Sequence, residues 1–404
     1  WSPPPELAPP RSFRDRIPVV GWLAMRKLHP IHGPRFWVRP MLVELLMGIG
    51  LAALYWWEVE QHGLIALQLA ELPAAPRSVG RVNLPAGPLH AAFAAHAILI
   101  TLMMAATLVD LDELMIPDAI TVYGALLGIA LVAMFPMALL PHVAERGTPM
   151  PASVDLGKPP GFLTNPGDEV YLEPVTATAP NLWPPKIFAP RSFEGLVCAL
   201  ACFALWLVAL TPRIWRGRRG TRHAASILLA RVMRELCRPP LAVIGLAGVV
   251  AIVAIWQIGG PHWLGLSTAL VGLVGSGALA WATRLAGSHA LGLESVGFGG
   301  VTLMVMVGTF IGWQAGIIVF FVAPFAGIVA GVTQLALRRG KVIPYGPYLC
   351  LGTLVVIVFW AQIWVVVQET FSLGVMVAAM LAIVMILLWA MLAVLSMIRG
   401  DRGR

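Results

Sequence analysis

Long apolar stretches recur along the chain and alternate with shorter polar segments. A helix that spans a bilayer needs about 20 consecutive, mostly apolar residues, because the hydrocarbon core is about 30 Å thick. Stretches near this length predict helices at 41–57, 90–109, 120–141, 194–212, 240–258, 264–283, 315–337, 348–367 and 374–398. A shorter apolar piece, 301–313, precedes the seventh of these. The pattern predicts an all-α polytopic integral membrane protein with about nine or ten transmembrane helices.

The composition indicates the same class of protein. Hydrophobic residues make up 58% of the chain and charged residues 12%, whereas soluble domains carry about 25% charged residues. This balance excludes an ordinary soluble protein. The four cysteines have no spacing typical of a disulfide framework or a zinc site, so we expect them to pack as small apolar side chains.

The net charge of +8 is explained by where the basic residues lie. Lys and Arg are concentrated in residues 1–40 and in the loop 212–239, and they are sparse in the loops 58–89 and 142–192. With the N-terminus inside and 301–313 counted as a crossing, 22 basic residues lie inside and six outside, as the positive-inside rule requires. The basicity therefore sets topology. We expect a lipid bilayer and no nucleic acid as partner, although the charge of the 212–239 loop leaves nucleic-acid binding open there.

The pattern divides the chain into three parts. Residues 1–40 form a cytoplasmic segment rich in Pro and Arg. Residues 41–367 form the membrane domain, with an irregular external loop at 142–192 and a basic cytoplasmic loop at 212–239. Residues 374–398 add an extra C-terminal transmembrane helix.

The apolar run 90–109 is directly followed by four carboxylates: Asp110, Asp112, Glu113 and Asp118. Ionisable groups at a membrane edge are energetically costly, so their clustering predicts a functional site. The alternative is a solvated helix end. We expect Asp112 and Glu113 to be solvated companions. Asp118 follows Pro117, and this order favours a helix start that Asp118 caps.

Four segments of the chain, in order, resemble the motifs of a known family. They are Ile17-Pro18-Val19-Val20-Gly21-Trp22-Leu23 with Leu42-Val43-Glu44-Leu45-Leu46; Asp110 with Pro117-Asp118; Gly297-Phe298-Gly299-Gly300-Val301-Thr302-Leu303-Met304 with Gly312-Trp313-Gln314; and Ile343-Pro344-Tyr345-Gly346-Pro347-Tyr348. Together they resemble the bacterial prepilin peptidase (type IV leader peptidase) family. Its members are intramembrane aspartic peptidases with a GxGD motif and two catalytic aspartates.

The resemblance implies an endopeptidase that cleaves the leader peptides of type IV prepilins or pseudopilins. It places the chain in the bacterial inner membrane, with its N-terminus and its active site on the cytoplasmic side. Asp110 matches the first catalytic aspartate, and Gly297 and Gly299 match the glycines of the second motif. The second aspartate position is occupied by Gly300. One aspartate cannot serve as both acid and base, so we expect impaired or absent peptidase activity.

Two further carboxylates are candidates for the site. Glu294 precedes the second motif and resembles an acidic residue that the family often carries there. Glu44 lies four residues inside an expected span, where a carboxylate is unusual. Either it makes a buried polar contact to the site, or it is near enough to the membrane edge to reach water. A second hypothesis is a non-catalytic membrane paralog that binds prepilin-like segments or secretion-machinery partners. A transporter with Asp110 and Asp118 as ion ligands is a third, which the motif order favours less.

The N-terminal segment departs from the family pattern. Members that also methylate the new N-terminus carry two Cys-x-x-Cys pairs, and here His29 and His32 stand where the second pair would be. A thiolate cluster cannot form from these residues, so we expect no metal, no cofactor and no methyltransferase activity. The family plan also has a helix before the segment that starts at Trp1, and this favours a trimmed start.

Overall fold

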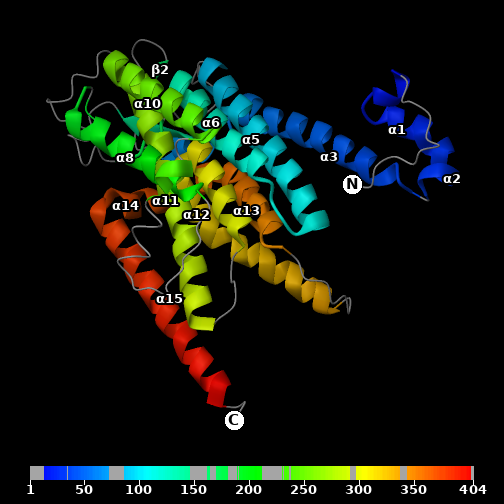
Figure 1. Cartoon of the computed structure of the whole chain (residues 1–404). Coiled ribbons are helices and arrows are strands. Elements are labelled where there is room, and N and C mark those ends of the chain that lie inside the picture. Colours follow the sequence, from blue (N-terminus) through cyan, green and yellow to red (C-terminus); the bar gives the residue numbers. More distant parts are fainter. Residues whose placement is uncertain are drawn as a thin grey trace. The chain divides into compact units, whose positions relative to one another are not determined.

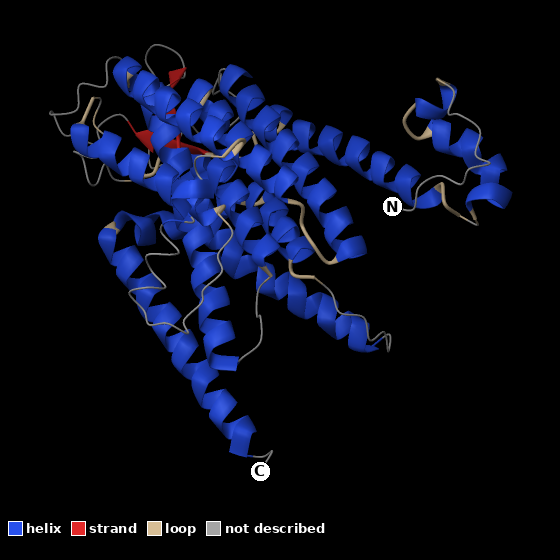
Figure 2. Ribbon diagram, in the orientation of Figure 1, coloured by secondary structure: helices blue, strands red, loops and turns tan. Residues whose placement is uncertain are grey.

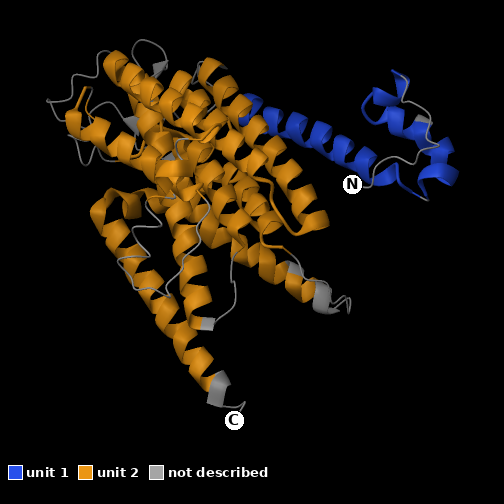
Figure 3. Ribbon diagram, viewed as in Figure 1, with its two compact units in different colours: residues 1–61 blue, residues 62–404 orange. Residues whose placement is uncertain are grey.

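The computed structural model describes residues 13–33, 35–71, 86–145, 162–163, 170–180, 189, 191–211, 230, 232–235, 238–291, 297–336 and 344–401. The chain forms two compact units, residues 1–61 and residues 62–404, coloured separately in Figure 3. Each unit is described by itself below.

The first unit consists of short helical turns followed by one long apolar helix. Its elements are η1 (Arg14–Arg16), α1 (Val20–Met25), η2 (Arg26–Leu28), α2 (His29–His32), α3 (Val38–Tyr55) and the π-helical η3 (Trp56–Glu60). The α3 and η3 segments together are long and apolar enough to cross a membrane. This agrees with the helix expected at 41–57.

The second unit is a helical bundle that carries one small sheet (Figures 1 and 2). Its helices are α4 (Ala66–Glu71), α5 (Ala86–Glu113), α6 (Asp118–Met134), η5 (Pro136–Ala138), α8 (Phe193–Ala209), α10 (Leu241–Ile258), α11 (Gly260–Leu291), α12 (Phe298–Ala336), α13 (Gly346–Val358), α14 (Trp360–Ser372) and α15 (Val375–Asp401). Its strands are β1 (Pro141–Glu145), β2 (Phe162–Leu163) and β3 (Val170–Pro174). Most of α11 is buried, whereas α10 and α15 contain few buried residues, as helices in contact with lipid do.

The predicted fold class is confirmed. Within the described residues, six helices are long and apolar enough to cross a membrane, and a bent pair would make a seventh. Two more apolar helices, α6 and α8, are shorter. All nine predicted stretches fall on helices, while the total of nine or ten crossings stays a prediction. The expected helix 120–141 ends early, at Met134, because Pro136 disfavours helical geometry at the residue before it.

The expected span at 348–367 falls on two helices, α13 and α14, and a single crossing by this bent pair stays a prediction. The chain bends by 90° between α13 and α14, at Phe359. The reason is the set of tryptophans on α14. Trp360 and Trp364 are fully buried, and the Trp360 indole N–H donates a hydrogen bond of 2.8 Å to the carbonyl of Pro141. These contacts direct α14 across the end of the bundle instead of continuing α13.

Helix α12 reverses direction at Gly312, which separates the predicted pieces 301–313 and 315–337. Gly312 has a left-handed backbone with φ of 78°, a conformation that glycine adopts without steric cost. Cβ atoms built on Gly308 and on Gly316 would both contact the Ser276 hydroxyl of α11. Residues eight apart in one straight helix lie about 12 Å apart along its axis. The two halves of α12 therefore pack side by side on α11.

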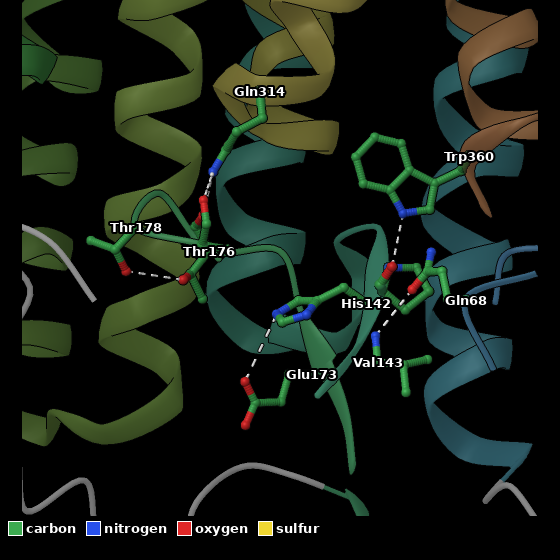
Figure 4. A network of polar contacts seen from close by, with 10 residues as sticks. Gln68, His142, Val143, Glu173, Thr176, Thr178, Gln314 and Trp360 are labelled. Atoms are coloured by element: carbon green, nitrogen blue, oxygen red, sulfur yellow. Dashed lines mark hydrogen bonds and ion pairs between the residues drawn. The ribbon is translucent and has the colours of Figure 1, made fainter. Parts of the chain in front are cut away.

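The loop 142–192 contains regular structure that the sequence did not predict. Strand β3 pairs antiparallel with both β1 and β2, giving the order β1-β3-β2. The first residue of β1, Pro141, accepts the hydrogen bond from Trp360 described above. Farther along the strand, the Val143 amide donates to the Gln68 side chain at 3.0 Å. Figure 4 shows these contacts around the sheet. The expectation of irregular structure is wrong for this part of the loop.

The segment after β3 is held by the Gly-Trp-Gln motif of α12. The Gln314 amide donates to the carbonyl of Thr176 at 2.7 Å, and the Trp313 indole donates to the carbonyl of Ala177 at 2.8 Å. The Ala177 amide donates to the Thr268 hydroxyl of α11 at 3.0 Å. Buried backbone groups need such partners. The motif therefore joins the sheet to the point where α12 reverses.

Candidate functional site

Asp110 is the buried member of the acidic cluster. It lies in the last turn of α5, and 5% of its surface is exposed. The other three carboxylates, Asp112, Glu113 and Asp118, are exposed. The alternative of a solvated helix end is therefore consistent with the exposure of these three carboxylates, but not with the burial of Asp110. A buried carboxylate needs hydrogen-bond donors to offset its desolvation.

The donor to Asp110 comes from the late Ile-Pro-Tyr-Gly-Pro-Tyr turn. The backbone N–H of Gly346 donates to the Asp110 carboxylate. Gly346 is also the first residue of α13, so the carboxylate lies near the positive end of that helix dipole. A Cβ on Gly346 would overlap Asp110 Oδ2 and would lie 2.9 Å from Ile116 Cδ1. A side chain at this position would displace the carboxylate, so the turn requires glycine.

The second glycine-rich motif meets the same place through Ile116. A Cβ on Gly299 would lie 2.9 Å from Ile116 Cβ, and Ile116 is buried. Gly300 is also buried, and its N–H donates to the carbonyl of Gly297 at 3.0 Å in the first turn of α12. Gly297 itself is exposed, with open space where a Cβ would be. Three motifs that are far apart in sequence thus converge around Ile116.

The loop from α5 to α6 shapes this convergence. The Leu114 amide donates to the Asp110 carbonyl at 2.9 Å, and Leu114 has a left-handed backbone with φ of 54°. This turn ends α5 and directs Ile116 inward. Asp118 is then the first residue of α6 and Pro117 its N-cap. The Asp118 carboxylate lies in the first turn, where a negative charge interacts favourably with the helix dipole.

The inner side of Asp110 is lined by small polar groups. The Thr107 hydroxyl, one turn earlier on α5, bonds to the Cys350 thiol of α13. The Cys350 thiol lies 3.6 Å from the carbonyl of Met103. Tyr345 precedes Gly346, and burial raises the pKa of its phenol to about 12. Tyr345 therefore stays protonated at neutral pH and is no base.

These contacts include residues that sequence reasoning missed. The sequence pattern predicts no role for Ile116, which links the motifs, or for the pair of Thr107 and Cys350. It includes Gly346 only as one residue of the late turn. The requirement for glycine at position 346 comes from its contact with the distant Asp110, and a single sequence does not show which distant residues will touch.

Glu44 belongs to the first unit and has a local role. Its carboxylate accepts hydrogen bonds from the Val19 amide at 2.7 Å and from the Trp22 indole at 2.9 Å. It therefore fastens the segment before α3 to that helix. Glu294 lies outside the described residues.

Chemically, the arrangement offers one ionisable carboxylate beside glycine backbone. A carboxylate can act as a general base toward water, but cleavage of an amide also needs a proton donor. Gly300 supplies none. Within the residues that the structure describes, no group of three His, Cys, Asp or Glu side chains could hold a metal ion.

Comparison with known proteins gives one partial similarity. The chain is 36% identical over 62 residues to the prepilin leader peptidase/N-methyltransferase of Aeromonas salmonicida strain A449. A second protein of this name, from Aeromonas salmonicida, matches with the same identity over the same length. The match covers 15% of this chain and 21% of each relative. No family model matches the chain, and no solved structure matches it. The chain is therefore similar, over about a fifth of their length, to prepilin leader peptidases.

Proposed function

We propose that the chain is a prepilin leader peptidase-like membrane protein whose peptidase activity is impaired or absent. Its substrates or ligands are the leader segments of type IV prepilins or pseudopilins, at the cytoplasmic face of the bacterial inner membrane. The observation that carries the proposal is the convergence of Asp110, Gly299–Gly300 and Gly346 at one place. The partial similarity to prepilin leader peptidases supports the same family link.

An aspartic peptidase divides its chemistry between two carboxyl groups. One is ionised and removes a proton from the attacking water, and the other is protonated and donates to the scissile carbonyl. Asp110 has the burial and the backbone donor suited to one of these roles. The second role falls on position 300, where glycine has no side chain. General acid catalysis contributes about 10²- to 10⁴-fold, so its loss is severe.

Gly300 also supports the second candidate function. A membrane protein that keeps the convergence of motifs but lacks the acid could bind prepilin-like segments without cleaving them. Open space beside Gly297, at the exposed start of the second motif, would let an extended chain approach the backbone there. Methyltransferase activity forms no part of either proposal, because the Cys pairs are absent from residues 1–40.

The experiment is leader cleavage by purified protein reconstituted in liposomes with a prepilin substrate. We expect no cleavage by the wild type and restored cleavage by Gly300→Asp. Gly300→Asn is the matched control, since it adds nearly the same volume without an ionisable group. The double variant Gly300→Asp with Asp110→Asn should again be inactive.

Two results would change the proposal. Normal cleavage by the wild type that Asp110→Asn abolishes would show that another group supplies the proton, and Glu294→Gln would then be tested first. Continued inactivity of Gly300→Asp, combined with crosslinking of the prepilin to the wild-type protein, would favour the binding function. Inactivity without crosslinking would count against both candidates.

A further inference from the structure

The segment 13–27, here called the foot, exposes large apolar side chains. Phe13 is 84% exposed, Val20 58% and Leu23 50%. Single exposed apolar residues are ordinary on a protein surface, but three within eleven residues are a cluster. Only Gly21 and Met25 of the foot are buried among its described side chains. The foot therefore folds with Phe13, Val20 and Leu23 outward.

Basic side chains surround these apolar groups. Arg14, Arg16, Arg26 and Lys27 are all exposed, and Asp15 is the one acidic residue in the foot. Exposed apolar groups bordered by cations are typical of protein segments that lie in the headgroup region of an anionic membrane. In such segments the cations contact lipid phosphates, while the apolar groups enter the acyl boundary.

The hydrogen bonds to Glu44 place the foot alongside the first turns of the membrane-spanning helix. Glu44 lies six residues after Val38, where the membrane-spanning helix begins, which corresponds to about 9 Å along the axis. Its carboxylate accepts from Val19 and Trp22 of the foot. The foot is thus fastened beside α3 and not beyond its end. Interfacial helices bury their apolar face about 5–10 Å into the headgroup and acyl boundary.

The backbone at Val19 indicates that this placement is enforced. Val19 has φ of 63°, a left-handed conformation that costs a β-branched residue free energy. Its N–H is the group that donates to Glu44 at 2.7 Å. Because the strained residue is also the fastened one, the hydrogen bond holds the turn that presents Val20 and Leu23 outward.

We propose that the foot is a binding site for anionic phospholipid, in which Arg14, Arg16, Arg26 and Lys27 contact headgroups and Phe13, Val20 and Leu23 enter the bilayer. The site lies entirely within the first unit. It is independent of the proposed peptidase chemistry, since it involves neither Asp110 nor Gly300.

The test is amide hydrogen exchange by mass spectrometry, with the full chain in nanodiscs of phosphatidylcholine with or without phosphatidylglycerol. Amides of 20–25 should exchange more slowly when phosphatidylglycerol is present. In Arg26→Gln/Lys27→Gln this protection should fall by about five-fold for each charge removed. Arg234→Gln/Arg238→Gln is the matched control, because it removes two exposed arginines elsewhere and should leave the protection unchanged.

A second variant tests the apolar contact independently of charge. Leu23→Ser removes an exposed apolar group and should increase exchange of the foot in both lipid mixtures, while exchange of α3 stays at the wild-type level. Equal exchange with and without phosphatidylglycerol would overturn the proposal. So would equal losses in the two double-glutamine variants, or protection that appears only when a soluble protein is added, since that indicates a protein-docking surface.

Discussion

Acid should loosen the sheet from the helices, because His142 on β1 is buried in a neutral state. Burial lowers the pKa of His142 from 6.5 to about 4. Its Nε2 lies 3.8 Å from Glu173 Oε2, and its ring lies 5.8 Å from the ring of Trp364. A backbone hydrogen bond at Val143 raises the pKa of His142, but the effect of burial is larger. Figure 4 shows the pair between the strands.

The sign and the size follow from the two pKa values. The unfolded segment takes up a proton near pH 6.5 and the folded one only near pH 4, so the stabilising effect is fully present above pH 6.5 and declines as the pH falls toward 4. The loss is about 2 kcal/mol at about pH 5, or about a 30-fold larger opening equilibrium. Burial raises the pKa of Glu173, and its protonation favours the folded state. Glu173 therefore opposes the effect of His142.

The assay is amide exchange of 141–145 and 170–174 across this pH range, corrected for the intrinsic pH dependence of exchange. The wild type should open increasingly below about pH 6. In His142→Gln the acid-induced opening should disappear, and the remaining trend should reverse because of Glu173. His289→Gln, an exposed histidine on α11, should behave as the wild type. Acid-induced opening of the same size in His142→Gln would refute the reasoning.

Two further substitutions test packing by thermal unfolding of the purified protein. Gly346→Ala places a Cβ against Asp110 Oδ2 and should destabilise by about 1–3 kcal/mol; Gly331→Ala, where a Cβ meets open space, should be neutral or stabilising, and equal effects would contradict the contact. Trp360→Phe leaves the Pro141 carbonyl without its 2.8 Å donor and should cost about 1–3 kcal/mol. In Trp360→Phe, faster amide hydrogen exchange should be confined to β1. Unchanged exchange of β1 would contradict the role given to this hydrogen bond.

Hydropathy predicted the class of fold well because the bilayer imposes one strong constraint. Any segment that crosses must be helical and apolar over about 20 residues, so every expected stretch falls on a helix. Hydropathy carries no information about direction, however. The apolar character continues through Gly312 and through Phe359, and the chain reverses at the first and bends at the second. Both changes depend on contacts with distant residues, such as Ser276 and Pro141.

The sequence predicted some residues of the candidate site, but it did not predict the packing that brings them together. The resemblance to prepilin peptidase motifs singled out Asp110 and the glycines, because each motif combines particular residue types at a fixed spacing. It did not predict that Asp110 alone among four carboxylates would be buried, nor that Ile116 would link the motifs. Burial results from the turn at Leu114 and from the approach of α13. These depend on the packing of helices that lie more than 200 residues apart in the sequence.

The glycines beside Asp110 differ from what simple packing between helices would require. A contact whose only purpose is to join helices is stabilised by apolar side chains that fill the space between them. Here two segments lack side chains beside a buried carboxylate, and one of them, at Gly346, supplies the backbone donor that offsets its desolvation. This arrangement leaves no room for a side chain at Gly346, and it fixes the position of the buried Asp110 carboxylate. With glycine at position 300, the group that the proposed function lacks is the proton donor, while the buried carboxylate and its backbone donor are present.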